Sequence, residues 1–322
     1  MLNLNKFILF FSFFAFNASA IDFSCVDLEE DEYEFDYSNE KIVSVGKKSV
    51  CLIDTKTSKK TEIYKFERSA KAVAKVAISD ENVFLNTEDC VFKCLDFSGN
   101  VIFQKTLQAV SRSGIFIDNS NVFFASINQY VYCYSKNGDL VWFNKDNPSN
   151  DLIYKCKLFV GKYIYLLNKS GISIIDKRTG FLYLAIDKFK EARDFYVVGD
   201  DVVCSISDHD FVLYEVMTGV TKKNDNYFPT YFISGKSNYS YKDSVLKNLD
   251  NGKEYKFEAI SFEFFEGKVF AYNKNSYNYD QLVIIDGEKV TFEKLDFKIR
   301  KMIYKDRMFV AFDGSKIYWA NI

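Results

Sequence analysis

The chain offers little for acid–base or metal chemistry, because it contains a single histidine, His209 in the segment SDHDF. A Ser-His-Asp triad needs a histidine beside a nucleophile, and no nucleophile elbow lies near this one. A histidine-rich metal site needs several imidazoles. No Walker loop or GxGxxG segment is present to hold a nucleotide. We therefore expect His209 to be a solvated loop residue, and we expect no catalytic residue, no metal site, no bound cofactor and no enzyme activity.

Cysteine chemistry is the second candidate. The chain has seven cysteines, an odd number that cannot pair completely: Cys25, Cys51, Cys90, Cys94, Cys133, Cys156 and Cys204. We expect Cys90 and Cys94 on one face of a strand, about 13 Å apart at the usual rise per residue, beyond the roughly 7 Å limit between disulfide Cα atoms. No CxxC pair suggests a zinc site. We expect most of these thiols to be small buried hydrophobic groups rather than a disulfide framework.

Charge gives one local feature, the acidic segment DLEEDEYEFD at residues 27–36. It could serve as a calcium site or as a docking strip for a basic partner, but a solvated lead-in to the first structural unit is the interpretation we favour. The whole chain is balanced, with 42 Lys and Arg against 44 Asp and Glu. Nucleic-acid binding needs a basic stripe, so we exclude a nucleic-acid partner.

Residues 1–20, MLNLNKFILFFSFFAFNASA, have the form of a secretory signal peptide. Lys6 supplies the positive start, FILFFSFFAF the apolar stretch and Ala18-Ser19-Ala20 the small-residue cleavage site. The apolar stretch is shorter than the about 20 residues of a membrane-spanning helix, although an uncleaved membrane anchor is the alternative. We expect an exported protein that is cleaved after Ala20 and has no transmembrane helix, with one domain at residues 21–322.

The rest of the chain must supply the elements that position any binding surface, and it is repetitive. The segment NVFFASINQYVYCYSKNGDLVWF (121–143) predicts strands at 121–126, 130–135 and 140–145, with Asn137-Gly138 as a hairpin signal. The same pattern recurs along the chain, and its copies are marked by turn glycines at intervals of 33 to 42 residues: Gly99, Gly138, Gly180, Gly219, Gly252 and Gly287. A four-stranded unit that repeats every 40 residues or so is typical of a β-propeller.

We count eight such units, and the last one holds only three strands before the chain stops. An N-terminal strand, from IDFSCV or EYEFDY, would complete it and leave no long free sheet edge. Consecutive apolar residues within strands require both sheet faces to be covered, as in neighbouring propeller blades. The sequence therefore predicts an all-β, eight-bladed propeller of four-stranded antiparallel blades, closed by an N-terminal strand.

The repeat resembles the PQQ-like (quinoprotein-type) propeller repeat, which has the form xVYxxxxDGxVYALDxxTGxxxW. The segment 121–143 matches it nearly position by position, including Trp142, and a later copy keeps Asp176, Thr179 and Gly180. Quinoprotein dehydrogenases of this type bear an adjacent cysteine pair and Trp-docking repeats. This chain has no Cys-Cys pair and only two tryptophans, so the resemblance extends to the repeat and not to the PQQ cofactor.

Among exported proteins with eight such units, the chain resembles the BamB family, the propeller component of the outer-membrane β-barrel assembly machinery. That resemblance implies a non-catalytic periplasmic scaffold, peripheral to the outer membrane, that docks as a monomer on the barrel-forming subunit of a complex. Family members carry a lipidated Cys directly after the signal. Here Cys25 follows Asp22-Phe23-Ser24, a poor match to that motif. No partner-binding residue of the family is recognisable.

Two alternatives remain open at this point. An exported propeller could bind another protein or a glycan, and the sequons Asn168-Lys169-Ser170 and Asn238-Tyr239-Ser240 would matter in a eukaryotic source. A quinoprotein-type oxidoreductase relative is the third interpretation.

Overall fold

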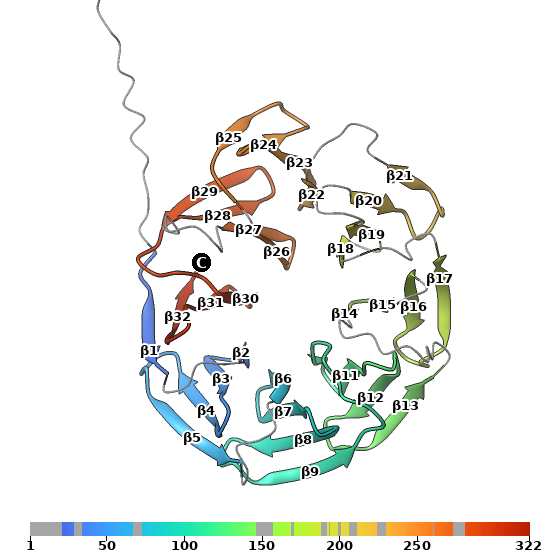
Figure 1. The fold of residues 1–322 in the computed structure, drawn as a ribbon, viewed down its shortest axis with the longest axis vertical. Helices are drawn as coiled ribbons and strands as arrows, with labels where there is room; N and C mark the ends of the chain where they lie inside the picture. The colour runs from blue at the N-terminus through green and yellow to red at the C-terminus, as the bar shows by residue number, and fades with distance from the viewer. Residues whose placement is uncertain are drawn as a thin grey trace, which may run out of the picture.

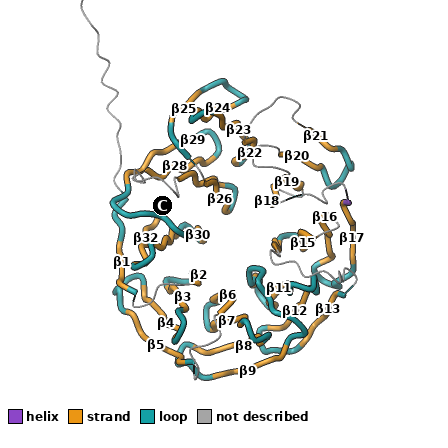
Figure 2. The backbone as a smooth tube through the Cα atoms, in the orientation of Figure 1, coloured by secondary structure: helices purple, strands orange, loops and turns teal. Residues whose placement is uncertain are grey.

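The structure is a computed structural model, and it describes residues 21–28, 34–66, 73–145, 157–168, 171–187, 192, 194–198, 201–205, 211–223, 230–259, 261–272 and 281–322. These residues contain 32 strands and no α-helix. The strands form eight four-stranded sheets, numbered here in chain order. In Figure 1 the sheets follow one another around a ring, and Figure 2 shows the loops that join their strands.

The first four sheets cover the N-terminal half. Sheet 1 comprises β2 (Glu34–Ser38), β3 (Lys41–Val45), β4 (Ser49–Asp54) and β5 (Lys60–Lys65). Sheet 2 comprises β6 (Val73–Ile78), β7 (Asn82–Thr87), β8 (Val91–Asp96) and β9 (Val101–Thr106). Sheet 3 comprises β10 (Phe116–Ile117), β11 (Asn121–Ala125), β12 (Val131–Ser135) and β13 (Leu140–Asn144). Sheet 4 comprises β14 (Lys157–Val160), β15 (Tyr163–Asn168), β16 (Gly171–Asp176) and β17 (Leu182–Ile186).

The other four sheets follow in the same way. Sheet 5 comprises β18 (Asp194–Val198), β19 (Asp201–Ser205), β20 (Phe211–Tyr214) and β21 (Thr221–Lys223). Sheet 6 comprises β22 (Thr230–Ser234), β23 (Ser237–Lys242), β24 (Val245–Asn248) and β25 (Glu254–Lys256). Sheet 7 comprises β26 (Ser261–Phe265), β27 (Lys268–Tyr272), β28 (Gln281–Asp286) and β29 (Lys289–Lys294). Sheet 8 comprises β30 (Lys301–Lys305), β31 (Met308–Phe312), β32 (Lys316–Asn321) and the N-terminal β1 (Ser24–Asp27).

Strand order within a sheet follows chain order, and every pairing is antiparallel. The first strand of each sheet lies toward the inside of the ring and the last strand toward its rim (Figure 1). Sheet 8 differs, because its rim strand comes from the other end of the chain. There β1 pairs with β32, with Ser24 opposite Trp319 and Asp27 opposite Lys316. Of the two candidate closing segments, IDFSCV supplies this strand, whereas EYEFDY supplies β2.

Buried side chains gather between neighbouring sheets, so both faces of a sheet are covered. Phe84 and Phe92 of sheet 2, for example, pack with Phe124 of sheet 3, and Phe123 of sheet 3 packs with Ile164 of sheet 4. This is why several consecutive residues of one strand can be buried, as in NVFFA, where the last four residues are. The prediction of an all-β chain of four-stranded antiparallel sheets is confirmed.

Candidate interaction surface

The acidic segment does not behave as a solvated lead-in, and that expectation was wrong for its last residues. Glu34 and Asp36 lie in β2, on the inside of the ring. The Glu34 carboxylate binds the ammonium groups of Lys75 in β6 (3.0 Å) and Lys301 in β30 (2.5 Å). Glu34 therefore links sheet 1 to both of its neighbours. Residues 29–33 of the segment lie outside the described residues.

Asp36, two residues further along β2, also contacts both neighbouring sheets. Its carboxylate accepts a hydrogen bond from the backbone N–H of Ile78 (2.9 Å) and lies 3.8 Å from the ammonium of Lys305. Burial raises the pKa of Asp36 above its ordinary 3.8, although Lys305 acts in the opposite direction. Burial likewise lowers the pKa of Lys301, against the attraction of Glu34. These charged groups pair with one another between neighbouring sheets, so we assign them a structural role.

A polar cleft lies beside this network, where the first hairpins of sheets 8, 1 and 2 turn. It has a volume of about 470 Å³ and is lined by Tyr37, Ser38, Asn39, Glu40, Asp80 and Asp306. Two of its three carboxylates are engaged with neighbours: Glu40 pairs with Lys56 (2.7 Å), and Asp80 accepts a hydrogen bond from the hydroxyl of Ser38 (3.4 Å). Groups of three or more metal-binding side chains do not occur among the residues that the structure describes.

The Asp of the repeat pattern shapes the turn that leads into a rim strand. In sheet 4, Oδ1 of Asp176 accepts hydrogen bonds from the backbone N–H of Thr179 (2.8 Å), the Thr179 hydroxyl (2.9 Å) and the N–H of Arg178 (3.0 Å). These bonds lower the pKa of Asp176 below its ordinary 3.8. Asp54 and Asp96 cap the corresponding turns of sheets 1 and 2. The motif residues Asp176, Thr179 and Gly180 thus build a turn.

The turns of sheets 4 and 1 each rest on the preceding sheet. The indole N–H of Trp142 in β13 donates to the carbonyl of Lys177 in the turn of sheet 4 (3.1 Å). A Cβ added at Gly180 would come within 2.6 Å of the Trp142 ring, and φ of Gly180 is +76°. The second tryptophan, Trp319 of sheet 8, donates to the carbonyl of Thr55 in the turn of sheet 1 (3.1 Å). Both tryptophans therefore join neighbouring sheets.

The turns place a group of apolar side chains in solvent, which we call the apolar rim. Among the described residues, every exposed large hydrophobic side chain but Leu249 belongs to it: Val101, Ile102, Leu140, Val141, Phe181, Leu182, Tyr183, Met217 and Val220. They lie at the start of the rim strands of sheets 2, 3 and 4 and in the β20–β21 turn of sheet 5. The most exposed are Met217 (74%) and Phe181 (71%). Four consecutive sheets thus present apolar groups at corresponding positions.

Two other rim strands carry charged residues at their exposed positions. Exposed positions of β5 include Thr61, Glu62 and Lys65, and those of β29 include Lys289 and Lys294. Charged residues on an edge strand discourage another strand from pairing with it. The rim strands β9, β13 and β17 are edge strands of their sheets too, yet they begin with exposed apolar pairs. This contrast between rim strands of one molecule distinguishes sheets 2 to 4, whereas the exposed apolar groups of sheet 5 lie in the turn before its rim strand β21.

The cysteines largely follow the prediction. Cys51, Cys94 and Cys133 are buried, and the five cysteines whose side chains are described form no disulfide. Burial raises the pKa of the Cys94 and Cys133 thiols to about 12, which leaves them protonated and inert. Cys25 is exposed, and Cys90 is a partly buried turn residue with φ +63° rather than the strand residue we expected.

Some other residues singled out in the sequence fall outside the described part of the chain. His209 and Cys156 lie outside the described residues, as does the signal segment 1–20. The sequon Asn238-Tyr239-Ser240 lies within β23, where the Asn238 amide donates to Asp250 (2.9 Å) and Tyr239 is fully buried. The apolar rim was missed, because an exposed apolar edge and a buried strand share the same residue pattern.

Comparison with known proteins places the fold. No protein-family model matches the chain, and no curated protein matches it. Among solved structures, BamB from Moraxella catarrhalis has a TM-score of 0.62 at 12% identity, over 92% of this chain and 96% of that one. The computationally designed Ika8 protein has a TM-score of 0.65 at 14% identity, over 91% and 98%. A chain in the crystal structure of the Mitotic Checkpoint Complex has 0.62 at 9% identity, over 99% of each. The chain has a propeller-like fold.

Proposed function

We propose that the protein is a closed eight-bladed propeller that serves as a non-catalytic, protein-binding scaffold in the periplasm, in the assembly of outer-membrane β-barrel proteins. The eight four-stranded sheets and the pairing of β1 with β32 support the closed ring. Similarity to BamB supports a protein-binding role of this kind. Within the described residues, the structure has no helix with the length and hydropathy of a membrane span. Enzyme activity and a resident cofactor form no part of this proposal.

The observation that carries the binding role is the apolar rim. Contiguous apolar patches on a protein surface mark interaction sites, and the apolar rim places nine exposed apolar side chains on consecutive sheets, at strand edges and in the β20–β21 turn. An edge strand presents backbone N–H and C=O groups to which an extended segment of a partner can add as a further strand. Burial of a side chain such as Phe181 or Met217 contributes about 1.5–3 kcal/mol. Sheets 2 to 4 therefore offer both backbone pairing and apolar contact to an extended partner segment, and the β20–β21 turn of sheet 5 adds apolar contact.

The test compares two surfaces of the same propeller. Phe181→Ser with Leu140→Ser removes apolar groups from the rim, whereas Thr61→Ser with Glu62→Ser alters the charged edge of sheet 1. Each protein would be expressed in the source cell, cross-linked and captured, and the barrel-forming subunit would be sought among the bound proteins. We expect capture by the wild type and the sheet 1 variant, and at least a tenfold loss for the rim variant, which corresponds to about 1.4 kcal/mol. Equal capture by both variants would remove the rim from the proposal.

Deletion of the gene tests the biological role separately. A scaffold in barrel assembly should leave outer-membrane proteins depleted when it is absent. Unchanged levels of those proteins in the deletion strain would contradict the assembly role and leave an exported propeller with a different protein partner.

A further inference from the structure

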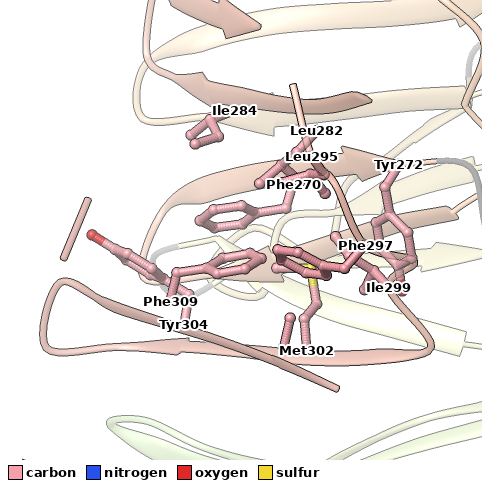
Figure 3. Close-up of a cluster of buried hydrophobic side chains, with 11 residues drawn as sticks. Phe270, Tyr272, Leu282, Ile284, Leu295, Phe297, Ile299, Met302, Tyr304 and Phe309 are labelled. Atoms are coloured by element: carbon pink, nitrogen blue, oxygen red, sulfur yellow. The ribbon is translucent and has the colours of Figure 1, made fainter. Parts of the chain in front are cut away.

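The segment that completes sheet 8 is held by more than the pairing of β1 with β32. We call residues 21–28 the clasp. Four apolar side chains of the clasp are half-buried, and the residues between them are exposed. Ile21 and Phe23 pack against the apolar cluster between sheets 7 and 8, part of which Figure 3 shows. Val26 and Leu28 pack against the cluster between sheets 8 and 1. One short segment therefore contributes to two interfaces between sheets.

Phe23 belongs to an aromatic group at the first of these interfaces. Its ring meets Phe297 edge to face with centroids 5.1 Å apart, and Phe309 of β31 with centroids 5.8 Å apart. The Phe297 ring also stacks on Tyr318 of β32, at 3.8 Å with planes inclined by 6°. Tyr318 is the residue opposite Cys25 in the pairing of β1 with β32. Aromatic contact and backbone pairing thus hold neighbouring residues of the clasp at the same place.

Polar contacts fix the other end of the clasp. The Asp27 carboxylate lies 3.3 Å from the Lys316 ammonium, and the N–H of Leu28 donates to the carbonyl of Ser315 (2.8 Å). The Asp27 side chain is 84% exposed, and exposed ion pairs contribute little to stability. We therefore expect Phe23, rather than Asp27, to decide how tightly the clasp is bound.

These contacts are of the kind by which an extended peptide adds to a sheet edge, where main-chain hydrogen bonds give affinity and side-chain pockets give specificity. We propose that the edge of β32 and the aromatic group around Phe297 form a peptide-binding site, which the clasp occupies in the folded chain. The ligand class is an extended segment with an aromatic side chain directly before the paired strand, as Phe23 stands before Ser24. This site lies on sheets 7 and 8 and is separate from the apolar rim.

The site also bears on how the N-terminus is processed. A lipid-bearing N-terminal Cys25 requires cleavage after Ser24, which would remove Ile21 and Phe23 together with the leader. Hydrolysis of the Ala20–Ile21 bond adds one water, leaves a carboxylate on Ala20 and an α-ammonium on Ile21, and keeps the whole clasp. We therefore expect the exported chain to begin at Ile21, with Cys25 as an internal strand residue. This consequence rests on the export that forms part of the proposed function.

The experiment uses the chain from residue 21 to residue 322 and the free peptide IDFSCVDL, with a fluorophore on the Cys25 thiol, which is exposed in the fold. Fluorescence anisotropy measures binding. In the wild type the tethered clasp competes at high effective concentration, so we expect little binding of the peptide. Phe23→Ala in the chain weakens the clasp, and the peptide should then bind at least tenfold more tightly than it binds the wild type.

Changes on the two sides of the aromatic contact test its specificity. Phe297→Ala, added to Phe23→Ala in the chain, should weaken peptide binding at least tenfold. Phe23→Ala in the peptide should do the same. Asp22→Ala in the peptide alters an exposed residue beside the anchor and is the matched control, which should bind as the unaltered peptide does. Equal binding to the wild type and to the Phe23→Ala chain, or binding that ignores Phe297→Ala, would overturn the proposal.

Hydrogen exchange covers the case in which the Phe23→Ala chain does not fold. Phe23→Leu keeps an apolar side chain but loses the aromatic contact. We expect it to speed amide exchange at least threefold in β1 and in β32, and to leave exchange in β9 of sheet 2 unchanged. Equal acceleration in every sheet would assign Phe23 to the common core, and unchanged exchange in β32 would show that Phe23 does not anchor the clasp. Either result would contradict the site.

Failure of this site and failure of the proposed function give different results. N-terminal sequencing of the protein from the source cell should find Ile21 first. A mature chain that begins at Cys25 would contradict the processing, and a chain that keeps its leader would count against export while peptide binding in vitro stands. Loss of peptide binding together with normal capture of the barrel-forming subunit would count against the site on sheets 7 and 8 alone.

Discussion

Tyr196 and Phe264 stack face to face with ring centroids 4.2 Å apart and planes inclined by only 4°. They belong to β18 of sheet 5 and β26 of sheet 7, with sheet 6 between them in the ring. Figure 1 shows both strands on the inside of the ring. Aromatic contact therefore joins two sheets that are not neighbours, on a different part of the inner wall from the ion pairs of Glu34.

This stacking predicts a measurable coupling. Tyr196→Ala and Phe264→Ala should each destabilise the protein, and the double variant should lose less than the sum by about 0.5–1.5 kcal/mol, the usual range for an aromatic pair. Urea denaturation of the four proteins in the cycle gives this figure. Additive losses would mean that the two rings stabilise the fold independently, in contradiction to the contact.

Gly180 predicts how strongly the turns depend on the preceding sheet. Gly180→Ala would place a Cβ within 2.6 Å of the Trp142 ring at a backbone φ of +76°, so both overpacking and the left-handed backbone oppose it. We expect a loss of about 2–4 kcal/mol in the free energy of unfolding.

Gly252 is the matched control for that substitution. It has nearly the same backbone angle, φ +74°, with no heavy atom within 4 Å of an added Cβ. Gly252→Ala should therefore cost only the left-handed backbone term of about 1–2 kcal/mol. If the two variants lose equal stability in denaturant titrations, the close contact between Gly180 and the Trp142 ring does not contribute to the free energy of unfolding.

Asp176 predicts a pH dependence with a definite sign. The hydrogen bonds from Thr179 and Arg178 hold its pKa below the ordinary 3.8 in the folded protein. The ionised carboxylate therefore stabilises the fold above that ordinary value, and the contribution is lost as the pH falls through the folded pKa. Asp176→Asn keeps an oxygen for the same donors but cannot ionise.

The measurement is the thermal midpoint of both proteins across the acidic range. The wild type should exceed Asp176→Asn at neutral pH, and the difference should shrink and vanish in strong acid. Asp139→Asn, in the corresponding turn of sheet 3, serves as the comparison. A difference that persists unchanged in strong acid would assign the effect to lost geometry rather than to charge.

Strands and turns were predictable because their signals are local. The residues from Asn121 to Phe143 carry both the apolar runs and the Asn-Gly turn, and the observed strands β11, β12 and β13 fall within one residue of the expected bounds. The closing strand was not decided locally, because IDFSCV and EYEFDY have equal strand character. Only the pairing of chain ends in three dimensions selects the first.

The candidate site was largely hidden from the sequence for the same reason. Glu34 looked solvated, yet its partners Lys75 and Lys301 lie 41 and 267 residues away, a distance that no window of sequence spans. Leu140 and Val141 looked like interior strand residues and are about half exposed. Their exposure depends on the position of β13 at the edge of its sheet, which is a property of the assembled ring.

The last prediction concerns Glu34. Its carboxylate contacts two ammonium groups, Lys75 of sheet 2 and Lys301 of sheet 8, and so joins the first sheets of the chain to the last. Glu34→Gln keeps the shape of the side chain and removes the negative charge that both Lys75 and Lys301 contact, which leaves Asp36 as the carboxylate that acts on Lys301. Removal of one partner from a fully buried pair costs about 3–5 kcal/mol. These side chains retain 24–33% exposure, so we expect a loss of about 1–3 kcal/mol in the free energy of unfolding after allowance for solvent screening.

The midpoint of urea unfolding measures this loss, with Glu62→Gln on the exposed edge of sheet 1 as the control. Adding Lys301→Met to Glu34→Gln should recover part of the loss by removing one of the repelling charges. A Glu34→Gln protein as stable as the Glu62→Gln control would show that the three charges are held in place by the fold and add nothing to it.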